Sequence, residues 1–101
     1  MGEPQETCIQ SKPFFPLGRV VATPGALAAL EATGQLPDLF LARHIRGDWG
    51  DIPDEDRQEN ELSLREGFRI LSAYRTRLGT RLWVITEADR SSTCLLLPEE
   101  Y

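Results

Sequence analysis

Three runs of β-branched and aromatic residues fill the last third of the chain, and they constrain its fold more than any other feature. Strands are expected over residues 68–76, 80–87 and 92–97. The tripeptide at 77–79 has the length of a hairpin loop, and its glycine tolerates a positive φ. Because short turns join neighbouring antiparallel strands, the sequence predicts a C-terminal three-stranded antiparallel meander.

Helix signals occupy the middle of the chain. A short strand is expected first, at 18–22, and Thr23 then offers a hydroxyl N-cap for a helix over 24–33. Two further helices are expected, over about 38–44 and 53–66, each followed by glycine-containing sequence. The order β-α-α-α-β-β-β predicts an α+β domain with an N-terminal strand, two to three helices and the meander.

The hairpin loop also predicts a register. If Thr76 pairs with Thr80, Arg75 stands directly opposite Arg81 on one face of the sheet. Directly opposed like charges are unfavourable by up to about 1 kcal/mol. The two arginines therefore call for an anion between them, either a carboxylate from the acidic helix or a phosphate-like ligand.

The chain length of 101 residues points to one domain, expected at 17–101, and residues 1–16 are interpreted as a flexible tail. Phe14 and Phe15 are the tail residues able to dock on the body. No apolar run approaches the roughly 18 residues that a membrane span needs, and the N-terminus lacks the pattern of a secretion signal. We therefore expect a cytoplasmic protein with no membrane partner.

Charge is distributed unevenly along the sequence. Residues 38–66 hold nine carboxylates and four arginines, a surplus equal to the net charge of −5. Residues 67–86 hold four arginines and no acid. Net acidity argues against binding to a nucleic-acid backbone, which cations drive, so another protein is the expected partner. The oligomeric state stays open.

The sequence contains no complete catalytic or metal-binding set. Cys8 and Cys94 lack the clustering of a zinc site, and the acidic stretch after residue 47 departs from the spacing of a calcium loop. No glycine-rich phosphate loop occurs either. We therefore expect no metal, no cofactor and no catalytic residue. The alternative for His44 is a role as general base.

The loop after the second helix holds the densest group of candidate binding residues. Asp48 and Asp51 flank Trp49, and the only histidine lies just before them. Trp49 has two open interpretations: an exposed anchor for a partner, or a lid folded back on the core. The full set of candidate binding residues is His44, Asp48, Trp49, Asp51, Arg75, Arg81 and Arg90.

Several segments together resemble one family. They are VATPGAL at 21–27, GDWGD at 47–51, RILSAY at 69–74 and WVITEADR at 83–90. This pattern, which covers roughly residues 18–101, resembles small uncharacterised proteins carried on bacterial plasmids and integrative elements. Members are often labelled plasmid-related or as a type I restriction subunit. The resemblance implies a genomic setting and no particular reaction, and it carries over no catalytic residue.

Two functional hypotheses follow. The first is a non-enzymatic accessory protein of a bacterial mobile element that acts by protein–protein binding. The alternative is a small toxin-type ribonuclease that uses its arginine-rich strand face, with Arg75, Arg77, Arg81 and Arg90 available to contact phosphates.

Overall fold

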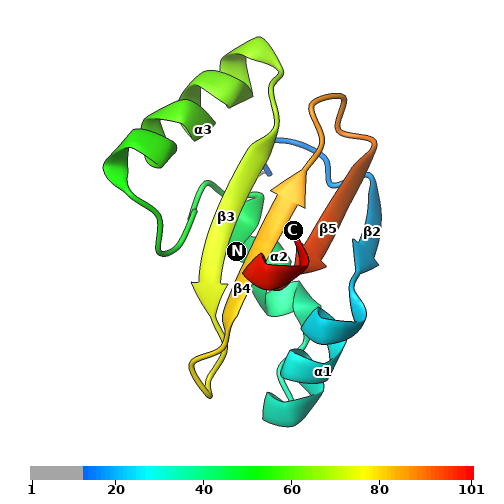
Figure 1. The fold of residues 1–101 in the computed structure, drawn as a ribbon. Helices are drawn as coiled ribbons and strands as arrows, with labels where there is room; N and C mark the ends of the chain where they lie inside the picture. The colour runs from blue at the N-terminus through cyan, green and yellow to red at the C-terminus, as the bar shows by residue number, and fades with distance from the viewer. Residues whose placement is uncertain (1–12) are drawn as a thin grey trace, which may run out of the picture.

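The computed structural model describes residues 13–101, which form three α-helices and one four-stranded sheet (Figure 1). The α+β class expected from the sequence is confirmed. In chain order the elements are β2 (Arg19–Ala22), α1 (Pro24–Thr33), α2 (Pro37–His44), α3 (Asp54–Glu66), β3 (Ile70–Arg75), β4 (Arg81–Thr86), β5 (Ser92–Leu96) and the 3₁₀ turn η2 (Pro98–Glu100).

The sheet is mixed, which corrects the prediction of a simple antiparallel meander. Its strand order is β2-β5-β4-β3, and the three C-terminal strands pair antiparallel. The N-terminal strand β2 joins them as a fourth strand, parallel to β5 (Figure 1). The three helices lie between β2 and the other strands in sequence, so this parallel connection is long, as parallel pairing requires.

The register predicted for the hairpin is confirmed. Arg75 lies opposite Arg81, and Ala73 lies opposite Trp83. The amide of Thr76 donates to the carbonyl of Thr80 at 2.8 Å, which closes the hairpin. Because hydrogen-bonded and non-hydrogen-bonded pairs alternate, the two arginines form a non-hydrogen-bonded pair, the arrangement in which side chains approach most closely.

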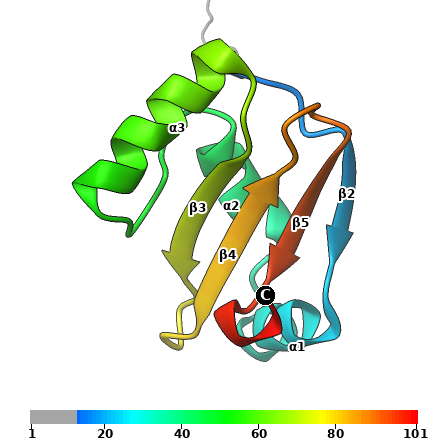
Figure 2. The ribbon, with the colours of Figure 1, turned by 45° about the horizontal axis from the view of Figure 1, so that its top comes forward.

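Helices cover one face of the sheet, as Figures 1 and 2 show, with α2 behind the strands and α3 beside β3. The main core joins buried side chains of α1 and α2 to those of the central strands: Ala26, Leu30, Phe40, Leu41, Tyr74, Leu82, Val84 and Leu95. Among residues 13–101, no helix has both the length and the apolar character needed to cross a membrane.

The segment before β2 belongs to the folded body from residue 14 onward, which shortens the tail expected at 1–16. The amide of Phe14 donates to the carbonyl of Ile45 at 2.6 Å. Phe15 is buried in a second cluster with Trp49 and Ile70. Residues 1–12, with Cys8, lie outside the described part of the chain.

A carboxylate ties the last turn to the start of α1. Glu100 accepts from the hydroxyl of Thr23 at 2.5 Å and from the amide of Gly25 at 3.0 Å. These hydrogen bonds, with that of Thr23 first, lower the pKa of Glu100. The negative charge lies at the positive end of the α1 dipole, where it is stabilising. A Cβ at Gly25 would meet the carboxylate at 2.5 Å, so a side chain there would displace the Glu100 carboxylate.

The outer edge of β3 is closed by two neighbouring segments. Asn60, on α3, donates from Nδ2 to the carbonyl of Leu71 at 2.7 Å and accepts the amide of Leu71 at 3.2 Å. Two residues further along β3, the carbonyl of Ala73 accepts a hydrogen bond from the amide of Asp51 at 2.6 Å. The amide of Ala73 donates to the carbonyl of Trp49 at 3.0 Å. Unpaired strand edges promote aggregation, and this edge is protected against it.

Replacing Asn60 by leucine should destabilise the domain by about 2 kcal/mol, because it leaves an amide and a carbonyl of β3 without partners in a site shielded from water. Urea unfolding followed by Trp fluorescence measures the change in the free energy of unfolding. Gln58→Leu, at an exposed position of the same helix, is the matched control and should change it little. Equal effects of the two substitutions would contradict the role assigned to Asn60.

Candidate functional site

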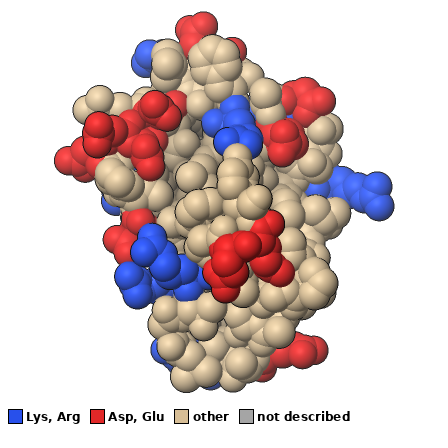
Figure 3. Space-filling model, in the orientation of Figure 1, with Lys and Arg blue, Asp and Glu red and all other residues tan. Residues whose placement is uncertain are grey.

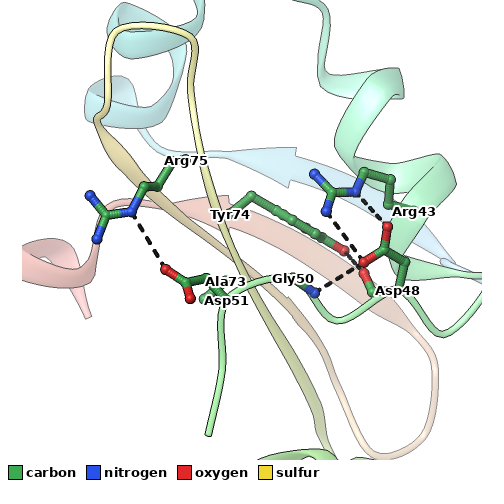
Figure 4. A pocket seen from close by; sticks show the side chains of 7 residues that line it. All are labelled: Arg43, Asp48, Gly50, Asp51, Ala73, Tyr74 and Arg75. Atoms are coloured by element: carbon green, nitrogen blue, oxygen red, sulfur yellow. Dashed lines mark hydrogen bonds and ion pairs between the residues drawn. The ribbon is translucent and has the colours of Figure 1, made fainter.

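An open pocket of about 380 Å³ lies between the loop after α2 and strand β3 (Figure 4). It brings together three of the binding residues predicted from the sequence: Asp48, Asp51 and Arg75. The complete lining consists of Arg43, Asp48, Gly50, Asp51, Ala73, Tyr74 and Arg75.

One wall of the pocket is an ion pair laid over an aromatic ring. The Arg43 guanidinium contacts the Asp48 carboxylate at 2.7 Å through Nε and at 3.3 Å through Nη2. It also lies 4.6 Å from the ring centroid of Tyr74, whose hydroxyl donates to the Asp48 carbonyl at 2.6 Å. The hydrogen bond from Arg43 lowers the pKa of Asp48 and raises that of Arg43 itself. Both groups are therefore ionised and held in place.

The opposite wall carries Arg75, one member of the arginine pair predicted from the register; Arg81 lies outside the lining. Arg75 and Arg81 share a face, as expected, and Arg75 Nε lies 3.5 Å from Oδ2 of Asp51. The carboxylate that pairs with Arg75 comes from the loop before α3, and not from the acidic helix itself, and among residues 13–101 no carboxylate contact of Arg81 is present. This contact is longer than that of Arg43 with Asp48, and both side chains are more than half exposed, so it contributes little to stability.

Glycine makes the pocket floor possible. Gly50 has a φ of +77°, and a Cβ there would lie 2.1 Å from the carbonyl oxygen of Ala73. Any other residue would therefore push the loop off β3. The close approach lets the backbone of Trp49 and Asp51 hydrogen-bond Ala73, which fixes the positions of the carboxylates around it.

Trp49 is a lid on the core, so its candidacy as an exposed binding residue is wrong. The side chain is only 2% exposed and stacks on Phe15 with ring centroids 6.4 Å apart. Its indole Nε1 donates to Glu61 at 3.4 Å, a long contact. Gly47 and Gly50, on either side, have φ values of +83° and +77°, so the chain turns at both ends of this short segment.

His44 is also absent from the surface, which removes it as a binding residue. The imidazole is fully buried at the end of α2, with Nδ1 2.5 Å from the Ser72 hydroxyl and Nε2 2.9 Å from the Thr86 hydroxyl. Burial, reinforced by the charge of Arg90, lowers its pKa to about 4. The ring is therefore neutral at pH 7.

The donor and the acceptor of each hydrogen bond around His44 can be assigned by starting from Thr93. Thr93 donates to the carbonyl of Leu17 at 2.7 Å, so its oxygen accepts from Thr86, also at 2.7 Å. Thr86 must then accept from Nε2 of His44, which leaves Nδ1 to accept from Ser72. All ring positions are satisfied in the neutral form, and a proton on Nδ1 would break the bond from Ser72.

Arg90 binds backbone carbonyls within the fold, which leaves it fewer donors for the phosphate binding suggested by the sequence. Its Nη2 donates to the carbonyl of Ser63 at 3.0 Å, at the end of α3. Its Nη1 contacts three carbonyls, those of Phe68 at 2.7 Å, Glu87 at 3.1 Å and Ala88 at 3.2 Å. The residue adopts a φ of +61°, which aims the side chain back at these carbonyls. A guanidinium used in this way has few donors left for a ligand.

The candidate residues therefore do not converge on one reaction centre. Asp48 lines the open pocket, whereas His44 is sealed in the core and Arg90 joins three chain segments. Across the part of the chain that the structure describes, no three His, Cys, Asp or Glu side chains are placed to share a metal ion. The two pocket carboxylates are paired with arginines, an arrangement suited to recognition of charged groups and not to proton transfer.

Sequence reasoning missed an apolar groove between α1 and α2. Leu27 lies three residues before the buried Leu30 on α1, yet it is 49% exposed at the groove. The sequence feature that could have revealed the groove is Leu36. It precedes Pro37 at the start of α2, a position where a polar N-cap residue is usual. The groove measures about 340 Å³ and is lined by Leu27, Leu30, Glu31, Gly34, Gln35, Leu36 and Pro37.

The buried imidazole should make the fold sensitive to acid. The pKa of His44 is about 4 in the folded chain and about 6.5 when unfolded, so only the unfolded chain takes up a proton between these values. The stabilisation is complete above about pH 6.5 and is lost as the pH falls to 4, by about 3 kcal/mol in all.

Urea unfolding of the wild type and of His44→Gln across pH 4–7 measures this effect. Depressed carboxylate pKa values, such as that of Asp48, act equally on both proteins, so the difference between the two curves isolates the imidazole. The wild type should lose more stability toward pH 4 than the variant does. Parallel curves would show that His44 does not carry the depressed pKa.

Comparison with known proteins found no matching family model, no matching curated protein and no matching solved structure.

Proposed function

We propose that the chain is a non-enzymatic accessory protein of a bacterial mobile element, and that it acts by binding another protein through the groove between α1 and α2. The observation that carries this proposal is a set of solvent-facing leucines, two that line the groove and one on the first turn of α2. Leu27 is 49% exposed, Leu36 is 68% exposed and Leu39, on α2, is 50% exposed. Clustered apolar side chains of this size mark interaction surfaces more often than isolated ones do.

The groove has the dimensions and chemistry of a side-chain receptor. Its volume of about 340 Å³ accommodates one large apolar side chain, with Leu30 as the floor. Gly34 ends α1 with a φ of +73°, which turns the chain sharply and leaves Leu36 projecting at the rim. A leucine or aromatic residue of a partner would bury apolar surface on both sides.

Charge favours a partner with basic residues beside that apolar anchor. Glu31 lines the groove, and the chain as a whole carries a net charge of −5. Figure 3 shows carboxylates gathered over α3, which adds a long-range negative field on one side of the molecule. Such a field increases the association rate of a cationic partner and depends on salt.

A photo-crosslinking amino acid at position 36, used in the cells that encode the protein, tests the groove. We expect one discrete adduct, because an exposed leucine at the rim would contact the bound partner. The same amino acid at Leu78, which is 69% exposed on the β3–β4 hairpin outside the groove, is the matched control.

The crosslinked protein, once identified and purified, then supplies a quantitative measurement. Leu36→Ser should weaken its binding by about 10-fold to 100-fold in calorimetry, the loss expected for one buried leucine side chain, and Leu78→Ser should leave it unchanged. An adduct at both positions, or no adduct at position 36, would remove the groove as the binding surface.

The toxin-type ribonuclease keeps one observation in its favour. Arg75 and Arg81 are directly opposed beside Trp83, whose indole lies 5.6 Å from the ring of Tyr101. Paired cations next to aromatic rings suit phosphates and bases.

Overexpression in a bacterium tests this second candidate. A ribonuclease should arrest growth, and Arg81→Ala should relieve the arrest through loss of a phosphate contact. Arg65→Ala, at an exposed position on α3, is the control and should not relieve it. Normal growth with soluble wild-type protein would exclude a toxin.

A further inference from the structure

In the described part of the chain, the β2 edge of the sheet has no partner strand. The amide of Arg19 donates to the carbonyl of Ser91 at 2.9 Å, and the amide of Thr23 donates to the carbonyl of Leu95 at 3.0 Å. The backbone N–H and C=O groups of these two residues therefore point toward β5. Because backbone direction alternates along a strand, Val20 and Ala22 direct theirs away from the sheet. Within residues 13–101, no backbone hydrogen bond to that outer side is present.

The open edge contrasts with the closed edge on the far side of the sheet. At β3, Asn60 and the loop at 49–51 occupy the outward backbone groups. β2 is protected only by its short length and by Arg19; it has no proline or bulge, and Val20 and Val21 are 44% and 41% exposed. These two adjacent exposed valines leave an apolar stretch of the edge on which another strand can pair.

We propose that a second copy of this chain pairs with β2 in antiparallel fashion, with a two-fold axis at Val21. The outward groups of Val20 and Ala22 lie symmetrically about that residue. Val20 of each copy then exchanges two hydrogen bonds with Ala22 of the other, which gives four in total. The valines at position 21 face each other, and the two sheets become one continuous sheet of eight strands.

The sequence of β2 fits itself in this register. Arg19 of one copy lies opposite Thr23 of the other, so the two arginines are kept at opposite ends of the pairing. A closed two-fold contact consumes both open edges and leaves none for further growth. The second copy is therefore the occupant that the edge itself specifies, and this inference does not depend on the α1–α2 groove.

The length of β2 sets the strength of the dimer. Gly18, with a φ of +66°, ends the strand on one side, and the N-cap Thr23 ends it on the other. A four-residue pairing buries less than the roughly 1,200 Å² of a stable interface, so the dimer should be weak. Each copy carries a charge of −5, and added salt should strengthen association by screening the repulsion.

Sedimentation velocity from about 10 µM to 1 mM, at low and high salt, tests the proposal on the protein alone. The wild type should shift from monomer to dimer with concentration, and further at high salt. Val20→Pro removes one outward donor and leaves the bonds to β5 intact, so it should remain monomeric. Val20→Thr keeps the donor and should dimerise like the wild type.

Oppositely charged substitutions at position 21 test whether the two-fold axis of the dimer passes through that residue. Val21→Lys and Val21→Glu place like charges face to face, so each variant alone should be monomeric while its Trp fluorescence stays native. A mixture of the two should recover the dimer, since opposite charges then meet. A wild type that is monomeric at 1 mM overturns the proposal. So does a dimer that survives in Val20→Pro, or a mixture that stays monomeric.

Discussion

The backbone groups along the outer edge of β3 need hydrogen-bond partners, and the chain between α2 and β3 is organised to supply them. Asn60 closes the edge at Leu71, and the loop closes it at Ala73. Because the loop is bonded to the strand, Trp49 is carried into the core and the carboxylates around it are held at the surface. Edge protection, core packing and the charged pocket thus depend on one set of contacts.

A second constraint crosses the interior. The buried chain of Ser72, His44, Thr86 and Thr93 joins α2 to three strands and ends on the backbone before β2. Each hydroxyl is satisfied only when the helix and the strands adopt this one arrangement, so the network favours a unique packing over other apolar alternatives. The cost is that the imidazole has no surface role.

Local patterns in the sequence predicted the strands, the hairpin and the shared face of Arg75 and Arg81, because alternation and short turns determine them. The parallel partner of β2 depends on pairing with residues about seventy positions later, which no local pattern encodes. The sequence left the role of Trp49 open between an exposed anchor and a lid, and it did not reveal the role of Arg90. Their partners are a buried cluster and scattered backbone carbonyls, which exist only in the folded chain.

Helix α3 is attached mainly through polar contacts. It fully buries only Asn60 and Ser63, and Arg57 fastens its first turn to the Gly50 carbonyl at 2.8 Å. Detachment of this helix as a unit would expose little apolar surface, so its opening equilibrium would respond weakly to urea. Its amides would exchange with solvent through such partial openings, whereas those of β4, enclosed by strands on both sides, would exchange only when the whole domain unfolds.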